Sequence, residues 1–384
     1  MKAGWEQRKL RDVCTLINGR AYKKEELLKS GPYPVLRVGN FFTNNNWYFS
    51  DLDLPDDKYC DNGDLLYAWS ASFGPRIWEG EKVIFHYHIW KVLPFPGIVD
   101  KKFLYYFFIW DTEQIKSDQG AGTTMIHVAK GSMEDRSLAV PSIAHQQRIV
   151  AILDEAFDGI ATAKANAEKN LQNARELFEN CLETVLTQKS DGWSEKKFDE
   201  ICDITSRLID PRDEQFCNLL HVGAGNIESK TGFLSGLQTA LEENLISGKF
   251  LFDESMVLYS KIRPYLMKVA RPDFSGLCSA DIYPLAPNPK YIVRDYLYYL
   301  LLTPSFTEYA IQGSARAGMP KVNREHLFNL RVQLPPLEEQ IPIAARLDSL
   351  RAETQRLEST YQQKLTALAE LKKSLLHEAF SGKL

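Results

Sequence analysis

Two histidines, two residues apart, are the side chains in this sequence that most readily suggest chemistry. His86 and His88 stand in the run IFHYHIW, where an extended backbone would place both on one face of a strand. Such a pair could bind a metal ion or act as a general base. Because no obvious Asp, Glu or His partner lies nearby, a structural role or a role in contacting a ligand fits the pair better than catalysis.

The signatures of several enzyme classes are absent from the sequence. It contains no G-x-x-x-x-G-K-[ST] phosphate loop, no H-E-x-x-H and no G-x-S-x-G. An amino-methyltransferase would need an acidic residue or Asn before Pro-Pro and an aromatic residue, with a glycine-rich cofactor loop. The Pro-Pro of this chain, Pro335-Pro336, lies between two leucines and opens a helix. We therefore expect no catalytic site and no cofactor on this chain.

Cysteine spacing and hydropathy indicate a cytoplasmic protein. The cysteines are scattered, with no C-x-x-C pair, and are Cys14, Cys60, Cys181, Cys202, Cys217 and Cys278. We expect them to be reduced core residues rather than disulfides or zinc ligands, so no metal site is predicted. The longest apolar run, Phe103–Trp110, is too short to cross a bilayer, and the N-terminus has no apolar signal-peptide core. No membrane partner is expected.

Length and composition predict a multidomain globular chain. Its 384 residues correspond to two or three domains, and a hydrophobic content of 44% excludes wholesale disorder. The formal net charge of −4 argues mildly against a surface coated in positive charge. It leaves room for local basic faces.

Cations and small polar side chains gather in a few loops. Lys and Arg bind phosphates, whereas Arg, Asn, Ser and Thr can read base edges, so these clusters favour a DNA-binding face. Any single cation could equally be a solvated surface charge. Trp69, Trp78 and Tyr265 could stack on bases but are as residue types more often core. The predicted DNA-binding residues are Arg20, Lys23, Lys24, Ser70, Ser72, Arg76, His86, His88, Thr123, Thr124, His127 and Lys130, and then Lys261, Arg263, Tyr265, Lys268, Arg271, Ser314, Arg316, Lys321, Asn323 and Arg324.

The chain contains an internal repeat. The segments PSIAHQQRIVAILD and PPLEEQIPIAARLD align with an offset of 194, which pairs Gln146 with Gln340. FLYYF and YLYYL align with an offset of 193, and matches nearer the N-terminus have offsets between 184 and 192. Shifting offsets indicate loop insertions and deletions, as expected of duplicated domains with diverged surfaces.

Each half consists of a globular segment and a long helix. The predicted division is 1–143, 144–190, 191–337 and 338–384. The globular segments contain short strands, predicted at Val35–Val38, Leu65–Trp69, Met256–Ser260 and Asp281–Leu285. The aromatic run Phe103–Trp110 and its counterpart RDYLYYLLLT are predicted as buried helices rather than strands.

Apolar residues three or four apart form a heptad-like seam along both long segments. Pro342 is tolerated only in a first helical turn, so the second helix should begin near Leu337. Each helix would be roughly 65 Å long. The two should pack on each other to bury their seams, antiparallel if the repeats obey a two-fold relation. A coiled coil that merely holds a dimer together is the simpler interpretation, but each coil follows a matching globular segment within one chain.

The repeated architecture, the P-x-x-x-x-Q-x-x-I helix openings and the C-terminal LKKSLLHEAFSGKL resemble the specificity subunits of type I restriction–modification systems. GW-x-x-x-x-L at the N-terminus, VGN at Val38, GDLLYAWSASFG at Gly63 and SKIRPYL at Ser260 resemble landmarks of the family's recognition domains. The resemblance covers essentially the whole chain. In one departure, the first helix opening has Ser142 and His145 where the second has Pro336 and Glu339.

The resemblance implies an α+β fold of two duplicated α/β target-recognition domains, separated by two long antiparallel coiled-coil helices with pseudo-two-fold symmetry. It implies that each domain reads one half of a bipartite site on double-stranded DNA in the major groove, while the helices set the unread spacer. Two methyltransferase subunits would dock on the chain, supply S-adenosylmethionine and flip an adenine for methylation. ATP-dependent, Mg-dependent restriction subunits would translocate and cut DNA.

Two competing interpretations remain at this point. One is the specificity subunit of a related system in which methylation and cleavage reside in a single partner chain, for which the sequence features would be nearly the same. The other is a coiled-coil adaptor with no role on DNA. The second is disfavoured because its globular loops would have no reason to cluster cations.

Overall fold

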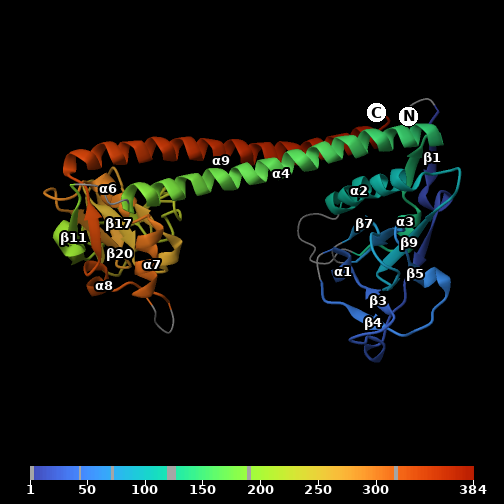
Figure 1. Ribbon diagram of the computed structural model, residues 1–384, viewed down its shortest axis with the longest axis horizontal. Helices are drawn as coiled ribbons and strands as arrows, with labels where there is room; N and C mark the ends of the chain where they lie inside the picture. The colour runs from blue at the N-terminus through green and yellow to red at the C-terminus, as the bar shows by residue number, and fades with distance from the viewer. Residues whose placement is uncertain (1–3, 43–44, 71–72, 119–126, 188–191, 315–318) are drawn as a thin grey trace. The chain divides into compact units, whose positions relative to one another are not determined.

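The computed structural model describes residues 4–42, 45–70, 73–118, 127–187, 192–314 and 319–384. The chain divides into two compact units, one of Met1–Ala167 with Gln363–Leu384 and the other of Glu168–Gln362. Two long helices, α4 (Ile143–Thr187) and α9 (Leu337–Phe380), contribute to both units (Figure 1). We call the globular part of the first unit, before α4, domain 1. The globular part of the second, between α4 and α9, is domain 2.

Domain 1 contains two four-stranded sheets and a separate strand pair. The first sheet has the order β2-β9-β6-β7, with antiparallel neighbours, and the second has the order β4-β3-β8-β5, in which β3 and β8 are parallel. The strands are β1 (Glu6–Lys9), β2 (Cys14–Asn18), β3 (Tyr33–Leu36), β4 (Tyr48–Ser50), β5 (Tyr59–Cys60), β6 (Leu65–Ala68), β7 (Gly74–Ile77), β8 (Val83–Phe85), β9 (Ile89–Pro94) and β10 (Ser137–Val140). The helices are α1 (Val38–Phe42), α2 (Lys101–Asp118) and α3 (Lys130–Glu134). Strands β1 and β10 pair with each other.

Domain 2 repeats this layout. Its sheets have the orders β12-β20-β17-β18 and β13-β16-β19-β14-β15, with β14 and β19 parallel, and β11 pairs with β21. The strands are β11 (Ser194–Lys197), β12 (Cys202–Asp203), β13 (Leu208–Ile209), β14 (Leu220–Val222), β15 (Gln238–Thr239), β16 (Lys249–Phe252), β17 (Val257–Ser260), β18 (Val269–Ala270), β19 (Gly276–Ser279), β20 (Ile282–Pro287) and β21 (Arg331–Leu334). The helices are α5 (Phe198–Ile201), α6 (Arg294–Leu300), α7 (Pro304–Gln312) and α8 (Arg324–Phe328). The order β12-β20-β17-β18 corresponds to β2-β9-β6-β7 of domain 1. Read in reverse, β15-β14-β19-β16 corresponds to β4-β3-β8-β5, and β13 is an additional strand beside β16.

The central strand of each domain is buried on both faces, which explains its continuous apolar sequence. In β6, Leu65 and Tyr67 belong to one hydrophobic cluster and Leu66 and Ala68 to another, because successive side chains point to opposite faces. Strand β17 alternates in the same way between two clusters. One cluster of each domain includes the aromatic helix α2 or α6 together with residues of both long helices.

A buried glutamine joins each domain to the helix that follows it. The Gln146 amide donates to the carbonyls of Ile98 and Pro141 and accepts from the Asp100 N–H, at 3.0, 2.8 and 2.7 Å. Gln340 makes the same three contacts with Tyr291, Pro335 and Val293. Both side chains are 0% exposed. The repeated P-x-x-x-x-Q pattern therefore serves to satisfy backbone groups that the helix start would otherwise bury unpaired.

A carboxylate about two helical turns further on fixes each helix to its domain. Asp154 accepts hydrogen bonds from Lys102 and the Tyr106 hydroxyl. Burial alone would raise the pKa of Asp154, but these hydrogen bonds outweigh it and hold the pKa below its usual value. In domain 2, Asp348 binds Arg271 and the Tyr299 hydroxyl, and its pKa is lowered for the same reasons.

The two long helices pack against each other within both units, and the pairing is antiparallel. In the first unit Lys372 near the end of α9 lies 4.8 Å from the ring of Phe157 near the start of α4. In the second unit the end of α4 faces the start of α9, where Arg175 forms an ion pair with Glu358 at 2.9 Å. Phe380, at the end of α9, packs on α2 of domain 1, with its ring 5.7 Å from that of Trp110. The predicted antiparallel pair is confirmed, as is a second helix that begins at Leu337.

Most of the predicted elements are present. The aromatic runs form helices α2 and α6, and the predicted strands at Leu65–Trp69 and Met256–Ser260 correspond to β6 and β17. The prediction for Val35–Val38 was wrong at its end, because β3 stops at Leu36 and Val38 opens the short helix α1. Asp281 lies in a turn rather than a strand, so that β20 begins one residue later.

Candidate DNA-binding faces

In domain 1 the turn between β8 and β9 leads from one sheet to the other and carries both histidines. The Trp69 N–H donates to the His88 carbonyl at 3.0 Å, and the Trp69 carbonyl accepts from the Val128 N–H at 3.1 Å. A bridge between Ser70 and His127 closes the arrangement. We call Trp69, His88 and His127 the corner of domain 1. The loop residues of three distant sequence segments are thus brought together.

The two histidines do not share a strand face, so that expectation was wrong. His86 forms an isolated bridge and His88 lies in the turn, with ring centroids 4.9 Å apart. Burial lowers the pKa of His86 to about 4, with a further contribution from His88 and Arg37. Burial and His127 lower the pKa of His88 as well. Both are therefore neutral at pH 7, able to donate and to accept hydrogen bonds without carrying charge. No cluster of three metal-ligating side chains was found among the described residues.

Other predicted residues of domain 1 differ in how free their side chains are. Lys23 and Lys24 are exposed at the start of the 3-10 helix Lys24–Glu26. Arg20 forms a two-pronged ion pair with Glu26, at 2.7 and 2.9 Å, and Lys130 lies 3.6 Å from Glu134. Arg76 donates to the carbonyl of Phe41. The cations that keep the most freedom to reach phosphates are therefore Lys23 and Lys24.

Domain 2 builds the same corner from other side chains. The Lys261 N–H donates to the Asp281 carbonyl at 3.0 Å, its carbonyl accepts from the Val322 N–H at 2.9 Å, and Ile262 bridges to Lys321. We call Lys261, Asp281 and Lys321 the corner of domain 2. The Lys321 ammonium lies 3.0 Å from the Asp281 carboxylate. Burial and the nearby Lys321 lower the pKa of Lys261, which also lies 4.7 Å from the ring of Tyr283.

Beside this corner, the turn Pro264–Leu266 carries an exposed aromatic side chain. Tyr265 is 52% exposed. The flanking residues Arg263 and Met267 both have left-handed backbones, with φ of 50° and 49°. Non-glycine residues pay for this conformation, so the surrounding structure must hold the turn in place. Arg263 is exposed next to Tyr265. Of the aromatic residues considered for base contacts, Trp78 is buried and Trp69 is half-buried, with its indole bound to the carbonyl of Tyr87.

Several predicted residues of domain 2 have structural partners. Arg271 is held by Asp348 and Asp295, and Lys268 donates to the carbonyl of Ala224. Ser314 is buried and bonds the Ile311 carbonyl, Asn323 caps α8, and Arg324 pairs with Asp203. Three of these sites, Lys268, Arg271 and Ser314, thus use their polar groups inside the domain or against α9.

Four predicted residues, Ser72, Thr123, Thr124 and Arg316, lie outside the described residues. Sequence reasoning missed Asp281 and Arg37. Asp281 could have been found, because the repeat aligns it with His88 at an offset of 193. Arg37 lines a polar pocket of about 340 Å³ with His86, His88 and Tyr48, and no sequence signal singled it out.

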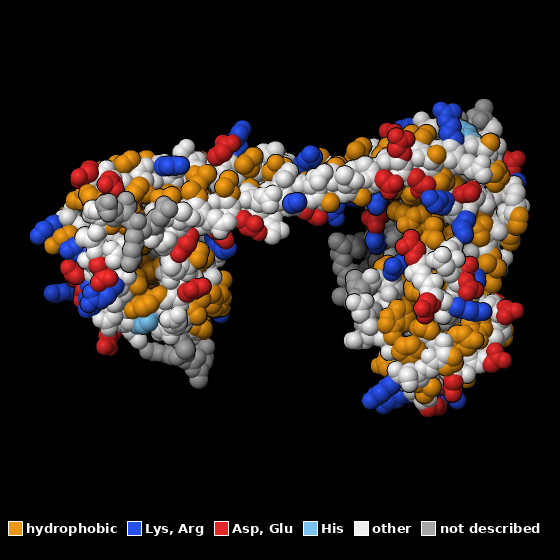
Figure 2. Space-filling model, viewed as in Figure 1, with side chains coloured by type: hydrophobic (Ala, Val, Ile, Leu, Met, Phe, Trp, Pro, Cys, Tyr) orange, Lys and Arg blue, Asp and Glu red, His pale blue; other side chains and the backbone are white. Residues whose placement is uncertain are grey.

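On the face that Figure 2 shows, charges are interspersed rather than collected into one basic patch. Figure 2 shows Lys and Arg side chains mixed with Asp and Glu on the visible surfaces of both domains. The net charge of −4 agrees with this mixture. Any electrostatic attraction to phosphates would therefore come from local groups of cations, such as those near the domain 2 corner.

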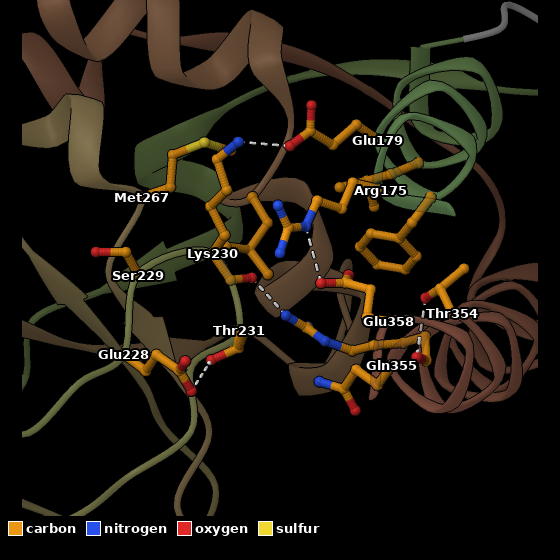
Figure 3. Close-up of a pocket in the computed structure, with 14 residues that line it drawn as sticks. Arg175, Glu179, Glu228, Ser229, Lys230, Thr231, Met267, Thr354, Gln355 and Glu358 are labelled. Carbon is orange, nitrogen blue, oxygen red and sulfur yellow. Dashed lines mark hydrogen bonds and ion pairs between the residues drawn. The ribbon is translucent and has the colours of Figure 1, made fainter. Parts of the chain in front are cut away.

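One cleft of the second unit lies where domain 2 meets the two long helices (Figure 3), and we interpret it as a joint between these elements rather than a ligand site. Its volume is about 280 Å³. Lys230 binds Glu179 of α4, while Arg351 of α9 donates to the Lys230 carbonyl and to the Tyr298 hydroxyl. These ion pairs and hydrogen bonds hold the loop at 228–231 against the two long helices.

The comparisons with known proteins agree with this architecture. A family model described as "Type I restriction modification DNA specificity domain" matches residues 2–172 and 190–367. The chain belongs to this family. Each of the two matched stretches contains one globular domain and part of a long helix, so the chain carries two DNA specificity domains.

Relatives named as specificity subunits cover almost the entire chain. The EcoDI type I restriction enzyme specificity subunit of Escherichia coli is 29% identical over 99% of this chain and 88% of the relative. The EcoBI specificity subunit of Escherichia coli is 21% identical over 99% of this chain and 86% of the relative. The MjaVIII specificity subunit of Methanocaldococcus jannaschii is 24% identical over 99% and 93%.

Two solved structures share the fold. One, from work on complex assembly and conformational transition of the type I restriction–modification system, has a TM-score of 0.79 at 17% identity and covers 100% of this chain and 99% of that chain. The HsdS subunit from Thermoanaerobacter tengcongensis has a TM-score of 0.62 at 17% identity, with 100% and 98% covered. Within the described part of the chain, no helix combines the length and the apolar composition needed to cross a bilayer.

Proposed function

We propose that the chain is the DNA-reading subunit of a type I restriction–modification complex, and that each domain reads one half of a bipartite, asymmetric DNA site. The observation that carries the proposal is the pair of corners. The same backbone hydrogen bonds recur in both domains, while the side chains they present differ in all three positions. Two readers on one framework with different side chains are what an asymmetric site requires.

The proposed contacts divide into phosphate and base contacts. The exposed cations Lys23, Lys24 and Arg263 suit phosphates, because their side chains are free to follow the DNA backbone. The corner side chains suit base edges, because they are held by a rigid backbone and offer both donors and acceptors. Tyr265 suits a contact with the sugar or base stack next to the phosphate bound by Arg263. The remaining predicted positions stay predictions.

The helical pair is proposed to set the unread spacer and to dock the methyltransferase subunits. Each long helix is continuous over 45 or 44 residues, and each is fixed to its domain by a buried glutamine and a bound carboxylate. A stiff connector of this kind transmits a change in its length to the DNA. Partner subunits are proposed to bring S-adenosylmethionine, and ATP-dependent restriction subunits to bring ATP and Mg. This chain is proposed to contribute recognition alone, in the cytoplasm.

Paired insertions in the helices test the spacer mechanism. Four residues of helical sequence are added after Ala167 in α4 and after Gln362 in α9, where the division between the two units crosses each helix. This adds about one turn, ~6 Å, to both helices and keeps their seams nearly in phase. The methylated motif of a host that carries the complex should keep both half-sites and gain about one or two base pairs in its gap.

The matched control replaces four residues at each of the same places without a change in length, and it should leave the motif unchanged. The chain without methyltransferase subunits should transfer no methyl group from labelled S-adenosylmethionine to DNA. A motif whose half-sites change while the gap stays constant would rule out the spacer mechanism.

A further inference from the structure

We propose that Asp281 reads a base that carries an exocyclic amino group in the major groove, cytosine N4 or adenine N6, in the half-site of domain 2. This rests on the function proposed above and names the base chemistry of one position in it. The expected pair is G·C, with the carboxylate on the cytosine amino group and a corner lysine on guanine O6 or N7. A carboxylate is the side chain that accepts from such amino groups.

The first argument is geometric. The backbone of Asp281 is held on both sides, since its carbonyl accepts from the Lys261 N–H at 3.0 Å and its N–H bonds the Ser279 hydroxyl at 3.3 Å. The side chain nevertheless remains 43% exposed. The Lys321 ammonium is hydrogen-bonded to one carboxylate oxygen, and a carboxylate has about four lone-pair sites, so acceptor capacity remains for a second donor. A fixed backbone with an accessible acceptor is suited to discriminating bases.

The second argument concerns charge. A carboxylate near DNA is repelled by phosphates, so Asp281 would weaken binding to every sequence unless it gained a hydrogen bond from a particular base. The neighbouring Lys261 and Lys321 leave the corner with a net positive charge, which offsets that repulsion. As an exposed ion pair alone, Lys321–Asp281 would contribute little to stability. Asp281 beside these two lysines can therefore contribute base selectivity rather than stability.

The third argument comes from the repeat. At the place of Asp281, domain 1 has His88, whose carbonyl accepts the same backbone hydrogen bond from the residue at the strand end. A neutral imidazole and a carboxylate offer different hydrogen-bonding groups on the same backbone support. One position of the framework thus presents two different readers. In the corner of domain 2 the lysines match guanine O6 and N7 and the aspartate matches the cytosine amino group, which are the usual partners of these side chains in the major groove.

The experiment compares the wild-type chain with Asp281→Asn, each assembled with its methyltransferase partners, by sequencing the methylated motif and by measuring methylation of single-base variants of that site. Asparagine has nearly the same shape but both donates and accepts, so the preference at one position of the domain 2 half-site should fall by about 10- to 100-fold or move towards adenine. The other half-site should not change. Binding to random DNA should tighten, because a repelling charge has gone.

Two further variants make the outcome decisive. Glu195→Gln neutralises another exposed carboxylate of domain 2, which pairs with Arg331 at 2.9 Å, and it should leave every position of the motif unchanged. Asp281→Glu keeps the charge but moves the carboxylate. Its complex should therefore prefer the same base at that position but methylate the site more slowly. If Asp281→Asn is unstable, the folded Asp281→Glu variant provides the comparison with the wild-type chain instead.

Every base pair carries one exocyclic amino group in the major groove, on cytosine or on adenine, so the pair found at the affected position identifies which of the two Asp281 contacts. The result that decides the proposal is whether discrimination at that position is lost or kept in Asp281→Asn. If Asp281→Asn keeps the complete motif and its discrimination, Asp281 serves only as the partner of Lys321. If the wild-type complex itself shows no bipartite motif, the proposed function fails, independently of Asp281.

Discussion

At the turn that joins the two sheets, domain 1 presents Trp69, His88 and His127, whereas domain 2 presents Lys261, Asp281 and Lys321 in the equivalent places. The backbone hydrogen bonds around these positions have nearly the same lengths, 3.0 and 3.1 Å in domain 1 and 3.0 and 2.9 Å in domain 2. The first corner is aromatic and carries two histidines, of which His88 has a lowered pKa, while the second contains two cations and one anion.

This difference shows which parts of the fold tolerate change. The hydrogen bonds that shape the corners join backbone groups, so the side chains there can vary without loss of the fold. The glutamines at the helix starts have not diverged, because each satisfies three backbone groups that nothing else could reach. Recognition can therefore vary between the domains while the joint between domain and helix stays the same.

The largest effect is expected from Gln146→Leu and Gln340→Leu. Each change leaves two carbonyls and one N–H without their side-chain partner at a fully buried site, and each such group costs about 1–3 kcal/mol. We expect a loss on the order of 3 kcal/mol or more, similar for the two domains. Hydrogen exchange around residues 98–103 and 291–297 would report each joint separately. A large effect at one glutamine and none at the other would contradict the equivalence of the two frameworks.

A smaller effect, unequal between the domains, is expected at the cations that bind Asp154 and Asp348. The side chain of Arg271 is 24% exposed and that of Lys102 is 52% exposed. Arg271→Ala should therefore lower the free energy of unfolding by about 1–3 kcal/mol, and Lys102→Ala by about 0–1 kcal/mol. Urea unfolding of the two variants measures the difference.

Arg263→Ala is the matched control for the arginine, since Arg263 is exposed and proposed to bind phosphate. It should leave stability unchanged but lower the salt dependence of DNA binding by about one unit of slope, which Arg271→Ala should not do. If Arg271→Ala lowers the salt dependence of DNA binding and Arg263→Ala does not, Arg271 contacts the DNA and Arg263 does not.

The last effect is expected from pH and concerns His86 of domain 1. The pKa of His86 is lowered from 6.5 to about 4, so the unfolded chain binds a proton there before the folded chain does. The stability that neutral His86 contributes is present above pH 6.5 and is lost as the pH falls towards 4. In His86→Gln the pH dependence of the unfolding midpoint between these values should be flatter. An unchanged profile would mean that His86 is not the group responsible.

The sequence by itself determined the repeat, and through it most of the architecture. Heptad spacing and the position of Pro342 predicted the two long helices and the start of the second, because helical periodicity is a local property of the chain. The aromatic runs of α2 and α6 were predicted as helices because the second run ends before Pro304, and both are helices in the structure. The repeated glutamine and aspartate of the two long helices could be aligned in the sequence, but the contacts that these side chains make could not be predicted from it.

Only the tertiary structure decided which side chains meet. Arg271 ends a stretch, 256–271, in which four cations meet no acid, yet it is bound to Asp348, which lies 77 residues away. Asp281 attracted no attention as one acidic residue among 50 Asp and Glu, and became a candidate only when the fold set it between Lys261 and Lys321. The physical reason is that periodicity and turn chemistry act over a few residues, whereas a recognition surface is assembled from loops whose proximity depends on the packing of the whole domain.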